Sequence, residues 1–348
     1  MFKIKNIKIS KEFPPFIIAE MSANHNQSLK TALNIVKSAA YCGVNAIKIQ
    51  TYTADTITIN SKRKEFKINS KKSLWNGNSL HSLYKKAYTP WKWHKKIFEE
   101  AKKYNILCFS SPFDGTAVDF LEELKNPIYK VASSECVDLD LIKKIAKTKK
   151  PMIISTGMAS KKEIFEAIEC AKINGCRNLA ILKCTSTYPA PVNEINLNTI
   201  EDMRKEFKCE VGLSDHTLGI GVPLVAITKG ATLIEKHFTL SKKIKSPDSI
   251  FSSEPEEFKQ LVKESKQIRS SLGKIKYGPS PQEKKSLIFR RSLYVVKTMK
   301  KNEIFSKTNI KSIRPALGLK TINLEKILGK KAAKNIKKGT PLKWNLIK

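Results

Sequence analysis

Eight short apolar segments, separated by lysine- and glutamate-rich stretches with helical spacing, constrain the fold of this chain more than any other feature. We expect β-strands at residues 16–21, 46–51, 107–111, 129–133, 152–156, 179–184, 210–215 and 233–238. Strands that alternate with helices form a parallel sheet. There are eight such units, and no Gly-x-Gly-x-x-Gly follows the first segment. The pattern therefore favours an α/β fold with a closed (β/α)8 barrel, a TIM barrel, over a doubly wound sheet.

The second segment carries a lysine and a glutamine where a fully buried strand would be apolar. Alternate residues of a strand point to the same face, so Lys48 and Gln50 would face one side while the neighbouring isoleucines face the other. In a barrel that polar side is the lumen. Polar residues also lie at or just after the carboxyl ends of the other segments: Glu20, Ser111, Lys130, Ser133, Ser186, Tyr188, His216, Glu235 and His237. In a barrel they would converge on one mouth, where active sites lie.

The rest of the chain suggests an insertion and a second domain. Residues 52–91 form too long an interval for a simple loop, and long loops in compact domains are usually functional. After residue 257 a helix leads into a polar stretch with Pro279 and Pro281, which is typical of a linker. We expect a barrel domain over 1–278, a linker over 279–286 and a small domain of short strands over 287–348.

The net charge of +34 is consistent with nucleic-acid binding, but the residue types favour compositional bias. Only 7 of the 65 basic residues are arginine, whereas phosphate-binding surfaces favour arginine. The last segment, 284–348, holds 19 basic residues against 2 acidic ones. Two alternatives remain: a nucleic-acid-binding protein built on a barrel, and a carbohydrate-binding module formed by the last domain alone. Neither needs polar residues at the strand ends, so we expect no nucleic-acid partner.

The sequence also indicates a cellular location. The first ten residues are basic without the apolar core of a signal peptide. No apolar run approaches the roughly 20 residues of a membrane helix, so we expect no membrane association. The seven cysteines are scattered without a Cys-x-x-Cys spacing. We interpret them as reduced thiols of a cytoplasmic protein.

Two histidines in the predicted mouth indicate a metal. His216 and His237 follow adjacent closing strands, and two imidazoles so placed suit a divalent cation with oxygen ligands in its other positions. Such an open site favours Mn²⁺ or Mg²⁺. We interpret His81 and His94 as core or surface groups, and His25 is left open between a site and a structural role.

Two lysines in the same lumen indicate an anion. Lys48 and Lys130 would repel each other there unless a ligand neutralised them. The hydroxyl groups of Ser111 and Ser133 add the donors that a phosphate or carboxylate requires. Together with a metal, which polarises a carbonyl or activates water, these residues predict a small substrate with several charges.

Six long motifs stand at these strand ends and near the C-terminus: IIAEMSANHN, AIKIQTY, YKVASSEC, CTSTYPAP, GLSDHTLGIGVPLVAITKGATLIEKHFTL and IRPALG. They resemble the motifs of the sialic acid synthase family of nonulosonic acid synthases, and the resemblance runs from Phe16 to the C-terminus. It implies a TIM barrel followed by an antifreeze-like (SAF) domain. It also implies a transferase that condenses phosphoenolpyruvate with the open-chain aldehyde of an N-acetylated sugar, giving a nine-carbon 2-keto acid and phosphate.

The resemblance implies roles for individual residues. Phosphoenolpyruvate would be held by Lys48, Ser111, Lys130, Ser133, Ser186 and Tyr188, although position 186 is usually Asn in the sialic branch. The sugar would meet Gln50, Tyr188 and Asp248. His216 and His237 would bind the metal with Glu20 nearby, and either Glu20 or Glu235 would position or deprotonate the attacking water. Arg314 of IRPALG would reach the barrel of a second subunit, which implies a domain-swapped homodimer.

Three stretches near the predicted mouth bear on the sugar. EMSANHN replaces the EIGxNHNG of the sialic and legionaminic branches, LWNGNSLHSLYKKAYTPWKWH resembles the insertion of the pseudaminic branch, and SPDSIFSSEPEEF has Ser249 where the sialic branch has His. The resemblance implies 2,4-diacetamido-2,4,6-trideoxy-L-altrose as the substrate, with the sialic and legionaminic sugars as alternatives. Trp75, Trp91 and Phe251 are candidates to meet its deoxy carbon. In related pathways flagellin commonly receives the product.

Overall fold

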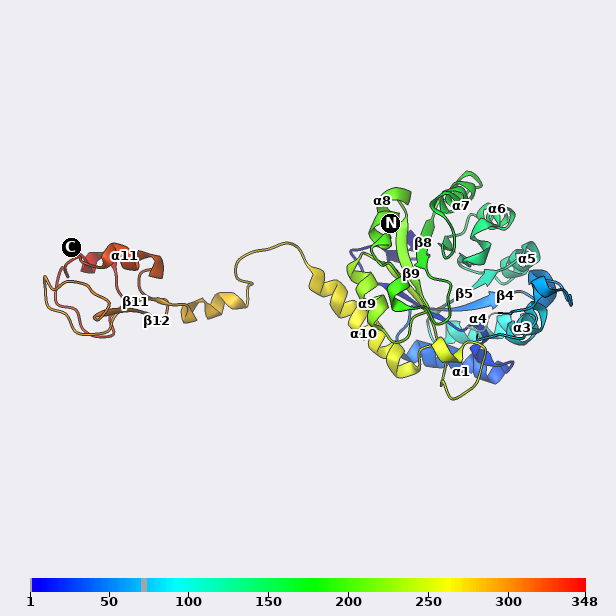
Figure 1. The fold of residues 1–348 in the computed structure, drawn as a ribbon, viewed down its shortest axis with the longest axis horizontal. Coiled ribbons are helices and arrows are strands. Elements are labelled where there is room, and N and C mark those ends of the chain that lie inside the picture. Colours follow the sequence, from blue (N-terminus) through cyan, green and yellow to red (C-terminus); the bar gives the residue numbers. More distant parts are fainter. Residues whose placement is uncertain (1, 70–73) are drawn as a thin grey trace. The chain divides into compact units, whose positions relative to one another are not determined.

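The computed structural model describes residues 2–69 and 74–348. The chain divides into two compact units, Met1–Gly273 and Lys274–Lys348 (Figure 1). The division falls shortly before the predicted linker at 279–286. Residues 70–73, which belong to the predicted insertion, lie outside the described residues.

The first unit is the expected TIM barrel. Within the described residues, eight parallel strands close in the order β10-β3-β4-β5-β6-β7-β8-β9. The strands are β3 (Phe16–Glu20), β4 (Ala46–Thr51), β5 (Leu107–Pro112), β6 (Tyr129–Val131), β7 (Met152–Ser155), β8 (Leu179–Cys184), β9 (Glu210–Asp215) and β10 (Leu233–His237). Each falls on one of the predicted segments, with small differences only at the carboxyl ends. The prediction of the fold class is therefore confirmed.

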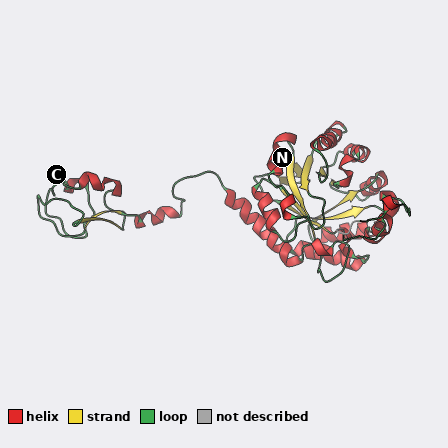
Figure 2. Cartoon of the chain, in the orientation of Figure 1, coloured by secondary structure: helices red, strands yellow, loops and turns green. Residues whose placement is uncertain are grey.

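Helices surround these strands (Figure 2). They are α1 (Leu29–Tyr41), α4 (His94–Lys103), α5 (Gly115–Glu123), α6 (Leu139–Lys147), α7 (Lys161–Ile173), α8 (Thr199–Phe207), α9 (Gly221–Thr228) and α10 (Pro255–Leu272). Several begin at a capping residue. Asp114 accepts from the first-turn amides of α5, and Ser160 forms a capping box with Glu163 at the start of α7. These caps explain where the helices begin after the loops of the mouth.

The alternation predicted for β4 is confirmed. Ile47 and Ile49 belong to the large apolar core between the strands and the helices, so Lys48 and Gln50 face the lumen. A second core fills the amino-terminal end of the barrel. There a hairpin that the sequence analysis did not anticipate, β1 (Phe2–Ile4) with β2 (Ile7–Ile9), adds apolar side chains to those of the barrel strands. The lumen is thus apolar at one end and polar at the other.

The described residues of the long interval after β4 form four short helices. They are α2 (Ala54–Ile57), η2 (Lys64–Phe66), α3 (Leu80–Ala87) and η3 (Trp91–Trp93). Ser79 caps α3 by accepting from the Ser82 amide. This insertion leaves the barrel at the carboxyl end of β4 and returns at α4, so it belongs to the end that carries the predicted mouth.

The second unit consists of short elements around its own core. They are η7 (Glu283–Phe289), β11 (Ser292–Val295), β12 (Ile310–Ile313), η8 (Thr321–Asn323), α11 (Leu324–Ile327) and η9 (Trp344–Leu346). Strands β11 and β12 pair antiparallel. Leu293, Phe305, Ile310 and Leu342 lie in the core of this unit. The unit thus contains the short strands that the sequence predicted.

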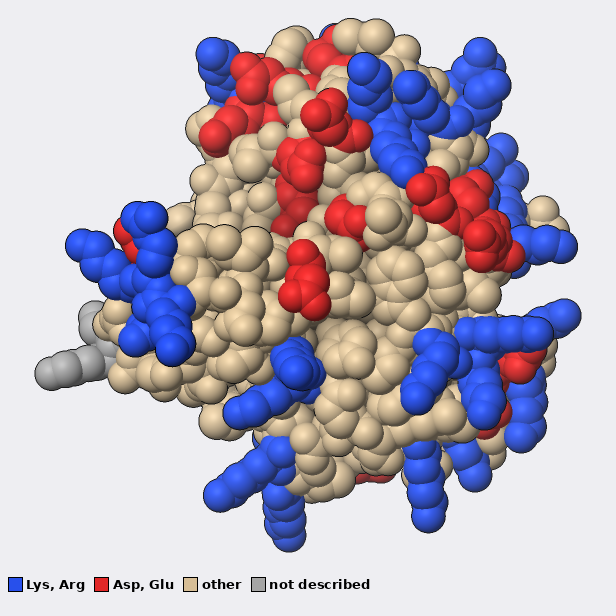
Figure 3. Space-filling view, turned by 90° about the vertical axis from the view of Figure 1, so that its right-hand side faces the viewer, with Lys and Arg blue, Asp and Glu red and all other residues tan. Residues whose placement is uncertain are grey.

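The distribution of charged and apolar residues bears on whether the protein binds nucleic acid or a membrane. On the side shown in Figure 3, lysine and arginine side chains are spread around the edge, and acidic side chains form a band between them. No single basic patch dominates that side. Among the described helices, none is both long and apolar enough to cross a membrane. All seven cysteines are free thiols.

Candidate active site

Strand register brings the first group of predicted site residues together. Glu20 at the end of β3 is the register partner of Lys48 on β4 and of His237 on β10. Gln50, two residues further along β4, is the partner of Ser111 on β5, and its Nε2 donates to Oε1 of Glu20 at 3.1 Å. The carboxyl ends of three adjacent strands thus present a carboxylate, an ammonium group and an imidazole side by side.

Two lysines and two glutamates form a buried cluster inside the lumen. Nζ of Lys48 lies 2.7 Å from Oε2 of Glu20 and 3.7 Å from Oε1 of Glu235. Nζ of Lys130 lies 3.3 Å from the same Glu235 oxygen. All four side chains are buried. The expectation that a ligand must neutralise the lysines was wrong, because Glu20 and Glu235 already pair with them.

Burial shifts the protonation of this cluster. Loss of solvation is the main reason that the pKa of Glu20 is raised and that of Lys130 is lowered. Burial also lowers the pKa of Lys48, but the charges of Glu20 and Glu235 outweigh this effect, so the pKa of Lys48 is raised. Lys48 is therefore a fixed positive charge in the lumen.

Hydroxyl groups surround the two ammonium groups. Ser111 Oγ accepts from Lys48 Nζ at 3.2 Å, and Ser155 Oγ accepts from Lys130 Nζ at 2.7 Å. Ser155 was not among the predicted site residues, although it is the last residue of β7 and the other strand ends carry predicted site residues. Hydroxyls beside ammonium groups form a surface that suits an anion.

The backbone at Gly157 passes close to the hydroxyl groups of Ser133 and Ser186. Its amide donates to Ser133 Oγ at 3.2 Å. A Cβ at this position would lie 2.8 Å from Ser133 Oγ and 2.2 Å from Ser186 Oγ. Only glycine allows the backbone to pass between these side chains, and Gly157 is a second residue that the sequence analysis missed.

The two predicted metal ligands lie side by side. The ring centroids of His216 and His237 are 5.3 Å apart. Nδ1 of His216 lies 3.0 Å from the carbonyl oxygen of Thr185, which leaves Nε2 for a ligand. Nδ1 of His237 is buried with no hydrogen-bond partner among the described residues, and Asp248 Oδ2 is 4.0 Å away.

The protonation state of His237 suits a metal ligand. Burial, reinforced by the neighbouring positive charges, lowers the pKa of His237 well below its ordinary value, so the ring is neutral as a metal ligand must be. No group of three or more His, Cys, Asp or Glu side chains with metal-binding geometry exists in the described part of the chain. A cation held by these two nitrogen atoms would have its other coordination positions open to water and substrate.

Aromatic side chains line one side of the site. The Tyr188 ring lies 4.3 Å from His216, 5.1 Å from Phe251 and 5.7 Å from Trp75, measured between centroids. Trp75 comes from the insertion, and its Nε1 donates to the Pro247 carbonyl at 3.1 Å. The insertion thus contributes an aromatic ring to the mouth.

The structure places the remaining candidates as follows. Asp248 is buried and accepts from the Ala23 amide at 3.1 Å. His25 uses both ring nitrogens within the fold, with the Gln27 amide and Thr89, which favours the structural role. Arg314 is an exposed residue of the second unit.

Trp91 does not join the aromatic side chains around Tyr188. Its ring stacks on Phe120 at 4.7 Å, and its Nε1 donates to the Tyr52 carbonyl. Packing between the insertion and helix α5 accounts for Trp91 without a ligand. Of the three aromatic candidates, Trp75 and Phe251 lie at Tyr188.

Glu135, in the 3-10 helix η4 (Ser134–Val137) after β6, should make stability depend on pH. Its Oε2 is buried without a hydrogen-bond partner among the described residues, and burial raises its pKa to about 7. Between about pH 4.5 and 7 the unfolded chain loses a proton that the folded chain keeps, so this residue lowers stability as pH rises. Glu135→Gln should therefore raise stability by on the order of 2 kcal/mol at about pH 8 and by little at about pH 4.5.

Thermal unfolding of the wild type and variant at both pH values measures this effect. Glu201→Gln, at an exposed position of α8, is the control and should give the same small shift at both. Equal shifts for Glu135→Gln at the two pH values would contradict the assignment.

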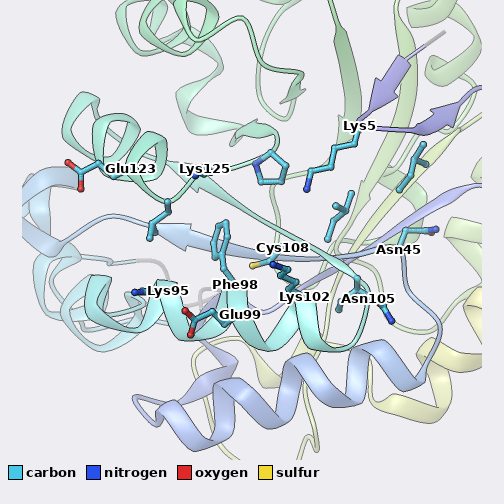
Figure 4. Close-up of a pocket in the computed structure, with 15 residues that line it drawn as sticks. Lys5, Asn45, Lys95, Phe98, Glu99, Lys102, Asn105, Cys108, Glu123 and Lys125 are labelled. Carbon is cyan, nitrogen blue, oxygen red and sulfur yellow. The ribbon is translucent and has the colours of Figure 1, made fainter.

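A cavity of about 810 Å³ lies at the opposite, amino-terminal end of the barrel (Figure 4). Residues that precede β4 and open β5, such as Asn45 and Leu107, line it together with Phe98 of α4. Charged residues also line it: Lys5, Lys95, Lys102, Lys125, Glu99 and Glu123. It contains none of the predicted site residues.

Comparison with known proteins places this site in a family context. The NeuB family model matches residues 35–277, and the SAF domain model matches residues 290–348. A pseudaminic acid synthase of Campylobacter jejuni is 47% identical over 94% of this chain and 95% of its own length. An N,N'-diacetyllegionaminic acid synthase of the same species is 41% identical over 92% of this chain and 96% of its own. The crystal structure of an N-acetylneuraminic acid synthetase from Leptospira borgpetersenii, in complex with citrate, has a TM-score of 0.72 and 33% identity, covering 82% of this chain and 94% of that one.

Proposed function

The chain belongs to the NeuB family, and on that premise we propose that it is a pseudaminic acid synthase. The reaction condenses phosphoenolpyruvate with 2,4-diacetamido-2,4,6-trideoxy-L-altrose to give pseudaminic acid and phosphate. The observation that carries this proposal is the buried cluster of Lys48, Lys130, Glu20 and Glu235 beside two imidazoles at the mouth of a barrel. The identity to a pseudaminic acid synthase over nearly the whole chain supports the choice of sugar.

The lumen offers binding groups for phosphoenolpyruvate. The ammonium groups of Lys48 and Lys130 would face its phosphate and carboxylate. The hydroxyls of Ser111, Ser133 and Ser186 and the ring of Tyr188 would complete the pocket. A ligand with several negative charges meets groups that are already fixed by the fold, so little ordering is needed on binding.

The bond changes follow from the reactants. The methylene carbon of phosphoenolpyruvate bonds to the aldehyde carbon of the sugar, and positive character develops at C2 of the enol. Water adds to C2, and the tetrahedral intermediate releases phosphate by cleavage of its C–O bond. A divalent cation, Mn²⁺ or Mg²⁺, held by His216 and His237 would polarise the aldehyde oxygen. Glu20 or Glu235 would position or deprotonate the water.

The sugar would lie against the aromatic side of the mouth. Trp75 and Phe251 flank Tyr188, and an apolar surface there suits a carbon that carries no hydroxyl. Gln50 and Asp248 offer polar contacts to the acetamido and hydroxyl groups. The sialic and legionaminic sugars are the alternatives for this site.

The second unit supports a proposal about assembly. By family resemblance, we infer a domain-swapped homodimer in which Arg314 of one subunit reaches the site of the other. The exposure of Arg314 and the basic composition of this unit support a role at an anionic site. The cytoplasmic location and flagellin as acceptor stay predictions.

Phosphate release from phosphoenolpyruvate tests the proposed activity. Purified protein with Mn²⁺ should turn over the altrose derivative well and N-acetylmannosamine or the legionaminic precursor poorly. Good turnover of N-acetylmannosamine with none of the altrose derivative would defeat the choice of sugar.

Trp75→Ala should raise KM for the altrose derivative more than KM for phosphoenolpyruvate, because the ring lies beside Tyr188 on the aromatic side of the mouth.

A further inference from the structure

A buried ion pair lies on the outer side of the barrel, directly behind the two histidines. Asp215 and Lys236 are register partners on β9 and β10. Nζ of Lys236 is 2.6 Å from Oδ2 of Asp215, and neither side chain is more than 1% exposed. Two residues earlier on each strand, at Leu213 and Ile234, the same face is part of the apolar core. The barrel packs against its helices mainly through apolar side chains. At this position the contact is instead ionic.

The pair holds the backbone around both imidazoles. Asp215 Oδ1 accepts from the amide of Thr217 at 3.1 Å and from its hydroxyl at 2.8 Å. Lys236 Nζ also donates to the Thr217 carbonyl oxygen. His216 lies between Asp215 and Thr217, and His237 directly follows Lys236. Lys236, which precedes His237, thus contacts both Asp215 and Thr217, the two residues that flank His216.

Stability alone explains this pair poorly. Burying two charges carries a large loss of solvation, and well-packed apolar residues in their place are often neutral or stabilising. An ion pair with further hydrogen bonds does what an apolar contact does not, because its directional bonds fix the two backbones relative to each other. Groups outside the coordination shell that fix the orientation of a metal ligand affect the affinity for the metal.

We propose that Asp215 and Lys236 are positioning residues that set the separation and orientation of His216 and His237, and through them the affinity for the divalent cation. The proposal rests on the metal site of the proposed function. It concerns residues that do not touch the substrate, the cation or the reacting atoms.

Mn²⁺ titration of the full-length protein, followed by electron paramagnetic resonance, tests the proposal without using activity. The double variant Asp215→Leu/Lys236→Met removes both charges together, so no uncompensated charge remains. It should keep its fold and melting temperature but bind Mn²⁺ about 10- to 100-fold more weakly than the wild type. Lys236→Arg, which keeps the ion pair, should bind Mn²⁺ more tightly than the double variant. Should the double variant not fold, Asp215→Asn/Lys236→Met gives the same test, because it keeps a side-chain oxygen for Thr217, removes the ionic contact and leaves no buried charge unpaired.

A second ion pair, at the other end of β9 and partly exposed, provides the control. Arg204 Nη1 lies 2.8 Å from Oε2 of Glu210, the first residue of that strand. Arg204→Met/Glu210→Gln should bind Mn²⁺ as the wild type does, even if it melts at a lower temperature. Wild-type affinity in the Asp215/Lys236 double variant, or an equal loss in the Arg204/Glu210 variant, would overturn the positioning role alone. Absence of Mn²⁺ binding in the wild type, or binding that His237→Ala leaves unchanged, would overturn the metal site of the proposed function as well.

Discussion

Replacing Lys130 with methionine should lower kcat/KM for phosphoenolpyruvate by about 100- to 1,000-fold, the range seen when one preorganised charge-stabilising donor is removed. The Lys130 ammonium group lies within hydrogen-bond reach of Ser155 and Glu235 in the lumen, where no solvent cation takes its place. Its loss also leaves the cluster with a net negative charge, which repels an anionic substrate. Steady-state kinetics with varied phosphoenolpyruvate measure the effect.

Two further variants distinguish the effect of Lys130 on activity from its effect on stability. Lys130→Met/Glu235→Gln restores the charge balance of the cluster, so it should regain stability while staying inactive. Lys150→Met removes a lysine that pairs with Glu122 at 2.6 Å, away from the mouth, and should retain activity. If Lys130→Met keeps wild-type kcat/KM, Lys130 has no role in holding phosphoenolpyruvate.

Removal of the divalent cation, or of one imidazole, should abolish most of the activity. A chelator should reduce the wild type to a residual rate, and added Mn²⁺ or Mg²⁺ should restore it. His237→Ala should lose about 1,000-fold in kcat, because polarisation of a carbonyl by a metal is worth several kcal/mol. Excess Mn²⁺ should not rescue this variant.

The control for loss of an imidazole is His81→Asn. The His81 ring pairs with the exposed Asp55 at 2.9 Å and contacts neither His216 nor His237. This variant should respond to chelation and to Mn²⁺ as the wild type does. Chelator-resistant turnover by the wild type would remove the metal from the proposed mechanism.

Sequence periodicity anticipated the parts of the structure that depend on neighbours along the chain. Alternation along β4 correctly predicted that Lys48 and Gln50 face the lumen, because a strand has a period of two. The amino-terminal hairpin was missed, since its two strands of three residues are too short for a periodic signal. Trp91 was placed among the sugar contacts because its position in the insertion said nothing about its stacking on Phe120.

The sequence by itself determined the order of strands and helices, the barrel they close into and the strand ends that carry polar side chains. Only the tertiary structure decided which charges meet. Glu20 and Glu235 come from strands at opposite ends of the first unit's sequence, yet both reach Lys48. The physical reason is that side-chain periodicity specifies a face of a strand, whereas distances between faces depend on register and closure of the whole barrel.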